Sequence, residues 1–147
     1  MTQWWRQPLA GDIAWCYFPR ELQVEPAEKP RPALILTVYD DEAPEFGVQV
    51  AYGTSKRVTT LYAGEFAITH ADCEAYRASG LSYDTKFNLA RRLNLPFNDE
   101  YFRVPPGARH GQQPKLGVLH PSLVRRAAAA FEASIKKPRP PTAPRQA

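Results

Sequence analysis

The first half of the chain consists of short apolar runs bounded by turn residues, a pattern that predicts β-strands. The runs occupy residues 13–18, 33–38, 48–52, 58–62 and 65–68. The second run is continuously apolar, as expected for a strand that is buried on both faces, whereas the third alternates between apolar and polar residues. The last two runs flank Ala63 and Gly64, which indicates a hairpin. Residues 39–46 are predicted to form a turn.

The middle of the chain predicts a short helix followed by another strand. Thr69 and Asp72 have the spacing of a capping box, with Asp at the position that Glu or Gln usually takes. Gly80 is suited to end the helix that this box opens. Residues 87–95 then alternate as in a strand, with Arg91 on the apolar face.

The C-terminal part contains the clearest helix signal. A short strand at 101–104 and a loop over 103–116 are predicted before it. Pro121 stands where a first helical position would be, and the residues after it form one apolar stripe at helical spacing. The stripe comprises Val124, Ala127, Ala128, Phe131 and Ile135. Several short strands with one or two helices predict a mainly β fold, a small, strongly curved barrel closed by the C-terminal helix.

Length and composition fit one domain at residues 1–137. The chain has 147 residues, a length typical of one domain. Residues 138–147 are rich in proline and arginine, a composition that cannot bury a core, and we expect a disordered tail. No apolar run approaches the roughly 20 residues that span a bilayer, and the N-terminus lacks the apolar region of a secretory signal. We therefore expect a soluble, cytoplasmic protein that does not contact a membrane.

The sequence offers no motif for a metal or another cofactor. Cys16 and Cys73 are too few for a disulfide framework or a zinc site. A Gly-rich phosphate loop, a paired-carboxylate spacing and a Cys/His metal motif are all missing from the sequence. We therefore expect the protein to work with no cofactor and no metal.

The charge is divided unevenly along the chain. The formal net charge is +4, but residues 1–85 carry 7 Lys and Arg against 12 Asp and Glu, whereas residues 86–147 carry 12 against 3. A strongly basic half indicates a polyanionic partner, and nucleic acid is the obvious one. Ordinary solvated surface charge is the alternative.

Three motifs follow one another in the first half: GDIAW at residues 11–15, RPALIL at 31–36 and VAYGT at 50–54. Each motif alone is weak, but the ordered set resembles the PemK/MazF family, the toxins of toxin–antitoxin pairs. That family opens with Gly-Asp and an aromatic strand, continues with an Arg-Pro-hydrophobic strand, and has a third strand that ends in threonine. The resemblance covers residues 9–70 well and the remainder loosely.

The resemblance implies an SH3-like barrel that forms a homodimer and acts as a metal-independent endoribonuclease on single-stranded RNA, such as mRNA. It also implies a cognate acidic antitoxin as a partner. The family's catalytic pair matches Arg31, at the start of the Arg-Pro strand, and Thr54, at the end of the next strand. Ordinary roles stay open for both residues: Arg31 could pair with Asp12 or Glu28, and Thr54 could be a turn residue beside Gly53.

Seven further residues are candidates for contacts with the RNA. They are Lys29, Ser55, Lys56, Arg57, His70, Arg91 and Arg92. Three of them follow Thr54 directly, the histidine follows the fifth apolar run, and the two neighbouring arginines could contact phosphates. The loop residues could equally be solvated residues without a function. The arginine pair could equally belong to a dimer interface or a buried ion pair. Trp4 and Trp5 could stack on bases or cap a core.

A second class of function stays open. A non-catalytic SH3-like barrel that binds RNA, DNA or a protein partner would use the basic half as its working surface. The segment 21–30 favours this hypothesis, since it contains two prolines and no glycine, whereas the matching loop of the toxins is rich in small and polar residues. An interaction protein of a phage or mobile element, with the barrel as its scaffold, is a third possibility.

Overall fold

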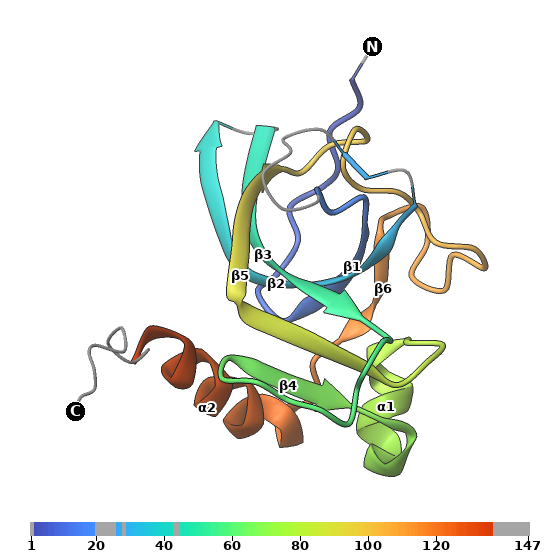
Figure 1. Cartoon of the computed structure of the whole chain (residues 1–147). Helices are drawn as coiled ribbons and strands as arrows, with labels where there is room; N and C mark the ends of the chain where they lie inside the picture. Colours follow the sequence, from blue (N-terminus) through green and yellow to red (C-terminus); the bar gives the residue numbers. More distant parts are fainter. Residues whose placement is uncertain (1, 20–25, 28, 43–44, 137–147) are drawn as a thin grey trace.

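The structure is a computed structural model that describes residues 2–19, 26–27, 29–42 and 45–136 (Figure 1). Six antiparallel strands in this part form one sheet in the order β4-β5-β3-β2-β1-β6. The strands are β1 (Asp12–Cys16), β2 (Arg31–Glu42), β3 (Glu45–Thr54), β4 (Glu65–Ile68), β5 (Thr85–Pro96) and β6 (Lys115–Val118). Two short 3₁₀ helices, His70–Asp72 and Pro121–Leu123, precede the helices α1 (Glu74–Ser79) and α2 (Val124–Ile135). The mainly β fold with a C-terminal helix that the sequence predicts is confirmed.

The long strand β5 bends in its middle, and this bend curls the sheet (Figure 1). Arg92 lies opposite Ala51 of β3, but the next residue of β3, Tyr52, lies opposite Asn88, so the register shifts between them. The shift leaves extra residues in β5 that have no partner in β3. Such extra residues bend the strand that carries them and increase its local twist. Leu89, inside the irregular stretch, is fully buried. The sheet therefore forms a curled half-barrel.

The glycines at the end of α1 and in β6 allow these two elements to lie in direct contact. A Cβ on Gly80 would overlap the carbonyl oxygen of Leu116, and a Cβ on Gly117 would overlap the carbonyl oxygen of Ala78. Gly80 also has a φ of +71° and ends α1 in the left-handed conformation, which only glycine adopts at little cost. The prediction that Gly80 ends a helix is confirmed. This contact brings α1, which follows the outer strand β4, against the opposite outer strand β6.

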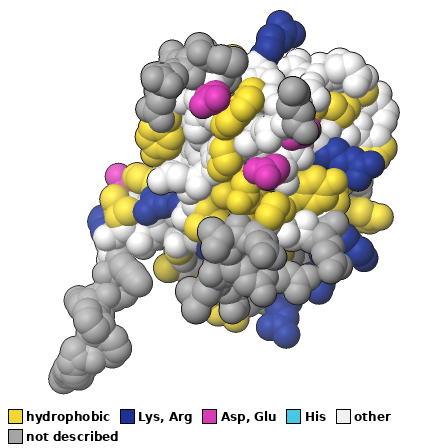
Figure 2. Space-filling model, turned by 90° about the horizontal axis from the view of Figure 1, so that it is seen from above, with side chains coloured by type: hydrophobic (Ala, Val, Ile, Leu, Met, Phe, Trp, Pro, Cys, Tyr) yellow, Lys and Arg dark blue, Asp and Glu magenta, His cyan; other side chains and the backbone are white. Residues whose placement is uncertain are grey.

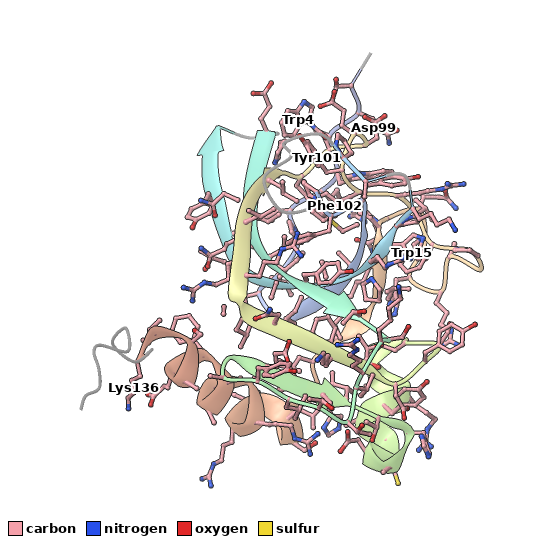
Figure 3. The ribbon with its side chains drawn as sticks, in the orientation of Figure 1. Trp4, Trp15, Asp99, Tyr101, Phe102 and Lys136 are labelled. Carbon is pink, nitrogen blue, oxygen red and sulfur yellow. The ribbon has the colours of Figure 1, made fainter. Side chains whose placement is uncertain are left out.

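The first of two hydrophobic clusters joins the central strands to the N-terminal segment. Trp5, Phe97 and Phe102 are buried in it, and the indole N–H of Trp5 donates to the carbonyl of Phe102 at 3.3 Å. Trp4 forms an isolated bridge with Asn98 and lies near Phe102 in Figure 3. Of the two roles open to these tryptophans, the structure supports capping of the core.

The second cluster lies between the sheet and helix α2, which packs against β4 and β5. Ala130 is buried there and Ala127 packs against its edge. The larger side chains of the predicted apolar stripe point away from the cluster: Val124, Phe131 and Ile135 are 51%, 40% and 58% exposed. The helix therefore contacts the sheet through small residues, and its larger apolar side chains stay partly exposed.

Two predictions about the segments between strands were wrong. The turn predicted at 39–46 is shorter, because β2 continues to Glu42 and β3 begins at Glu45. Backbone pairing with β3 extends the strand through acidic residues of low strand propensity. Residues 58–62 are not a strand. The buried Lys86 side chain holds them as a loop by donating to the carbonyl of Thr60 at 2.8 Å.

The segment 101–104 also differs from its prediction, since it forms only a bridge between Cys16 and Phe102. The sixth strand, β6, spans Lys115–Val118. It therefore begins inside the segment 103–116, where a loop was predicted, and continues just beyond it. This strand is four residues long and contains Gly117, so it has no apolar alternation that could reveal it. Its pairing with β1 is what makes it a strand.

The tail predicted at 138–147 lies outside the described residues, as does most of the segment 21–30. Within the described part of the chain, none of the helices is long and apolar enough to cross a membrane.

The capping box at Thr69 and Asp72 is confirmed. The Thr69 hydroxyl accepts from the N–H of Ala71 at 3.3 Å, and the Asp72 carboxylate accepts from the N–H of Thr69 at 2.9 Å. Asp72 also receives a hydrogen bond at 3.0 Å from the guanidinium of Arg126 on α2. This second bond, with the capping bond, lowers the pKa of the Asp72 carboxyl below its ordinary value. The box therefore ties the start of this helical segment to α2.

We expect the stabilising effect of Asp72 to disappear in acid. A carboxyl with a lowered pKa in the folded state stabilises the fold above its unfolded pKa and loses this contribution as the pH falls through the folded pKa. Asp72→Asn should therefore lower the free energy of unfolding by about 1 kcal/mol at pH 7, and by much less near pH 2.5. Urea unfolding at both pH values measures this. Glu132→Gln on the exposed side of α2 is the control, and an equal loss at both pH values for Asp72→Asn would contradict the prediction.

Candidate active site

A pocket of about 450 Å³ lies at the edge of the sheet where β2 begins and β3 ends. The starts of β5 and β6 and the residues after α1 complete its wall. Because neighbouring strands are antiparallel, the start of one strand and the end of the next lie at the same edge of the sheet. Arg31 and Thr54, the predicted catalytic pair, both line this pocket.

Arg31 is the first residue of β2 and pairs with Cys16 of β1. Pro32 follows it, and a proline restricts the preceding residue to extended geometry, which keeps Arg31 in line with the strand. The Cys16 thiol is fully buried, and this burial raises its pKa well above the ordinary value. The thiol therefore stays protonated and unreactive, and the guanidinium is the group that this end of β2 presents to the pocket.

The Arg31 side chain is half-buried, and none of the ion pairs among the described residues involves it. Asp12, one of the two ordinary partners considered for it, is paired with Lys115 at 3.4 Å instead. The Asp12 carboxylate also accepts from the N–H of Leu9 at 3.0 Å, so it stabilises the turn before β1. The other possible partner, Glu28, lies outside the described residues.

Thr54 is the last residue of β3 and lies opposite Lys86 of β5. Its hydroxyl oxygen accepts a hydrogen bond from the N–H of Lys56 at 3.1 Å. A hydroxyl has one proton to donate and two acceptor positions, so this bond orients the group without using its proton. The Thr54 side chain can therefore donate its O–H to an oxygen atom of a molecule in the pocket.

Gly53 allows β3 to lie close to both of its neighbours, β2 and β5, at this edge of the sheet. A Cβ at this position would be 2.7 Å from the carbonyl oxygen of Pro32 and 2.8 Å from the ring of Phe87. Contacts this short do not occur for real side chains, so glycine is the residue that fits between the two neighbouring strands. The ordinary turn role considered for Thr54 is compatible with the structure, because Thr54 ends β3 and its hydroxyl bond to the N–H two residues on is typical of turns.

Four cationic side chains line the pocket, and no acidic side chain does among the described residues. They are Arg31, Lys56, Arg109 and Lys115. A concave surface with this charge attracts anions such as phosphate groups. Arg109 and Lys115 were not predicted, because they lie in a segment whose only signal was the basic character of the second half. In the view of Figure 2 the described Lys and Arg side chains lie in separate groups around the outline, so this face carries no single basic patch.

Three aromatic side chains also line the pocket: Trp15, Tyr52 and Tyr83. Trp15 lies on β1, where its carbonyl accepts from the N–H of Arg103 at 3.0 Å. The Tyr52 ring packs against Phe18, whereas Tyr83 is 72% exposed. Sequence reasoning considered the N-terminal tryptophans for base stacking, and the pocket presents a different set of rings.

The predicted RNA-contacting residues divide according to their position. Ser55 and Lys56 line the pocket with the catalytic pair. Lys29 and Arg57 are exposed on the adjoining loops and do not line it. Arg57 has a φ of +50°, an unusual conformation for a residue other than glycine. The structure therefore brings two of these four residues to the pocket wall.

Arg91 and Arg92 do not line the pocket, although Arg91 contacts Tyr52, which does. The Arg91 guanidinium lies 5.1 Å from the ring centre of Tyr52, and it donates to the carbonyl of Pro19 at 3.2 Å. Arg92 lies 4.9 Å from the ring centre of Phe131 on α2. Both guanidinium groups therefore make cation–π contacts, and Arg91 also makes a hydrogen bond to a backbone carbonyl. These contacts take the place of the buried ion pair that was considered for them.

His70 does not line the pocket either, although it supports a neighbouring loop. Its Nδ1 lies 3.1 Å from the carboxylate of Asp84, which also accepts from the backbone N–H of His70 at 2.8 Å. The backbone hydrogen bond and the His70 ring lower the pKa of the Asp84 carboxyl. The described residues contain no group of three or more His, Cys, Asp and Glu side chains that could hold a metal ion.

No protein-family model and no curated protein matches the chain, but solved structures share its fold. An endoribonuclease from a mycobacterial species gives a TM-score of 0.54 at 17% identity, covering 94% of this chain and 100% of that chain. The Mycobacterium tuberculosis toxin MazF-mt6 gives 0.56 at 18% identity, covering 87% and 99%. A mycobacterial endoribonuclease in complex with its cognate antitoxin gives 0.52 at 17% identity, covering 90% and 99%.

The chain is thus a curled half-barrel protein with a basic pocket, lined in part by aromatic residues, at one edge of its sheet. It has the fold of MazF-type endoribonuclease toxins over most of its length. The fold that the PemK/MazF resemblance implies is therefore confirmed at an identity of only 17–18%.

Proposed function

We propose that this protein is the endoribonuclease toxin of a toxin–antitoxin pair and cleaves single-stranded RNA, such as mRNA, in the pocket of Arg31 and Thr54. The observation that carries the proposal is the position of these two residues. Arg31 and Thr54 come from two neighbouring strands into one pocket. Among the described residues, the Arg31 guanidinium has no carboxylate partner and the Thr54 hydroxyl donates its proton to no other group. The shared fold of endoribonuclease toxins supports it independently.

The chemistry needs no metal, because RNA carries its own nucleophile. The 2′-oxygen loses its proton and attacks the adjacent phosphorus, and the bond to the 5′-oxygen breaks as that oxygen takes up a proton. The products are a 2′,3′-cyclic phosphate and a free 5′-hydroxyl. The reaction passes through a phosphorane that carries extra negative charge on its oxygens. Hydrogen-bond donors directed at this charge lower the barrier.

Arg31 and Thr54 have suitable properties for this step. A guanidinium keeps its charge at every relevant pH and offers a planar set of donors to phosphate oxygens. The Thr54 hydroxyl adds one more donor from the neighbouring strand. Lys56 and Arg109 line the same pocket and would hold the flanking phosphates of the strand, whereas Lys115 is paired with Asp12.

Two partners belong to this proposal. One is an acidic antitoxin, whose carboxylates would complement the cations of the pocket. A structural neighbour is an endoribonuclease in complex with its cognate antitoxin. The other is a second copy of the chain. The exposed apolar side chains of α2, Val124, Phe131 and Ile135, support a homodimer, because apolar groups of this size are usually covered. Such a toxin would act in the cytoplasm, where mRNA is translated.

The proposal is tested by incubating the purified protein with a long unstructured RNA in excess EDTA. We expect cleavage that continues without metal and leaves 2′,3′-cyclic phosphate ends. Binding of the RNA with no cleavage, in the presence or absence of Mg²⁺, would favour the non-catalytic binding module instead. Cleavage that stops in EDTA would contradict the metal-independent mechanism.

A further inference from the structure

We propose that Tyr83 is a stacking platform for one nucleobase of the single-stranded RNA in the pocket. This inference rests on the proposed function and adds a residue that positions the substrate. Tyr83 lines the pocket wall with Arg31 and Thr54, and it is 72% exposed. Among the described residues, none forms a hydrogen bond or ring contact with its side chain; only its carbonyl is bonded. One aromatic face is therefore available to a ligand.

The loop that carries Tyr83 is held on both sides of the ring. Before it, Leu81 is buried in the second cluster. After it, the Asp84 carboxylate accepts from the N–H of His70 at 2.8 Å, and the hydroxyl of Thr85 donates to the Tyr83 carbonyl at 2.8 Å. Thr85 itself is buried. An exposed ring on a fixed backbone loses little conformational entropy when a ligand stacks on it, which is the property a stacking platform needs.

The surroundings of the ring favour nucleic acid over a protein partner. Sites for single strands combine cations that follow the phosphates with aromatic rings on which bases stack. The pocket has both, since Lys56, Arg109 and Lys115 share its wall with Tyr83, and no acidic side chain lines it among the described residues. The one carboxylate beside the ring in sequence, Asp84, is paired with His70.

A stacked base at this position would fix the strand at one side of the scissile phosphate. Stacking is made with the face of the base, which all four bases offer, so the contact tolerates different sequences. It is also made before and after the attack on phosphorus. Loss of the ring should therefore raise KM for RNA cleavage and change kcat little, whereas loss of Arg31 should lower kcat.

The inference is tested with a short 2′-O-methyl RNA of mixed sequence, which lacks the attacking hydroxyl and cannot be cut. We expect Tyr83→Ala to weaken its binding to the full chain by roughly 5- to 150-fold, the range for loss of one stacked base. Tyr83→Phe should bind like the wild type, and Tyr83→Leu should be as weak as the alanine variant. Tyr39→Ala is the control, since Tyr39 is an exposed tyrosine near the far end of β2.

The outcomes separate this inference from the proposed function. Because the probe cannot be cut, weaker binding of Tyr83→Ala supports the platform even if the wild type does not cleave RNA. Unchanged binding by Tyr83→Ala overturns the platform even if the wild type cleaves. No binding by the wild type also overturns it. Sedimentation of each variant is measured in parallel, and a loss of affinity that accompanies a loss of self-association would assign Tyr83 to a protein interface and overturn the inference.

Discussion

Arg31→Ala is expected to reduce RNA cleavage to a small residual rate while leaving the fold intact. Removing one donor that stabilises a developing oxyanion typically costs about 2.7–4 kcal/mol of barrier, which corresponds to roughly a 100- to 1,000-fold loss of kcat. The fold should persist, because the Arg31 side chain is half-buried and takes no part in the ion pairs among the described residues. Cleavage rates in EDTA measure the first effect, and thermal unfolding measures the second.

Two further variants make this result specific. Arg31→Lys keeps the charge but loses the planar set of donors, so we expect an intermediate rate. Arg6→Ala removes an exposed arginine outside the pocket and should leave the rate unchanged. Full activity in Arg31→Ala would remove this residue from the mechanism. A variant that is inactive and also unfolded would show that Arg31 has a structural role in its place.

Gly80→Ala is expected to have the largest effect on stability. A Cβ at this position would overlap the carbonyl oxygen of Leu116, and Gly80 has a φ of +71° that other residues adopt at a cost. Strain of the backbone and overpacking together should lower the free energy of unfolding by about 2–5 kcal/mol. Native domains have about 5–15 kcal/mol in total, so this loss removes a large share of the stability. Urea unfolding measures the change.

Substitutions at two other glycines distinguish backbone strain from overpacking as the cause of this loss of stability. Gly107 has a φ of +88° and nothing within 4 Å of an added Cβ, so Gly107→Ala should cost only about 1 kcal/mol. Gly117 has no positive φ, but a Cβ there would overlap the carbonyl oxygen of Ala78, so Gly117→Ala tests overpacking alone. If Gly80→Ala costs no more than Gly107→Ala, α1 is not held against β6 as described.

Gly80 also connects stability to the site, because it lines the pocket and precedes the loop of Tyr83. The contact of α1 with β6 places that loop beside Lys115, the first residue of β6. A substitution that separates the two elements should therefore weaken RNA binding as well as the fold. A partly folded Gly80→Ala sample that binds the uncleavable RNA normally would show that the pocket tolerates this movement.

The sequence alone determined those features that depend on neighbouring residues. The apolar runs at 33–38 and 48–52 became the central strands β2 and β3, and the boundaries set by Gly80 and Pro121 are those of the structure. The resemblance carried by the ordered motifs predicted Arg31 and Thr54 as the catalytic pair, and their role stays a prediction. The two residues reach one pocket because they stand at the start and the end of neighbouring antiparallel strands.

Only the tertiary structure decided which other residues complete the pocket. Arg109, Lys115 and Tyr83 are all far from Arg31 in the sequence, and no local pattern relates them to it. The same reason explains the missed strand β6, which exists through its pairing with β1, and the loop at 58–62, which is held by Lys86. Apolar periodicity depends on residues a few positions apart, whereas strand pairing and burial depend on contacts between distant segments.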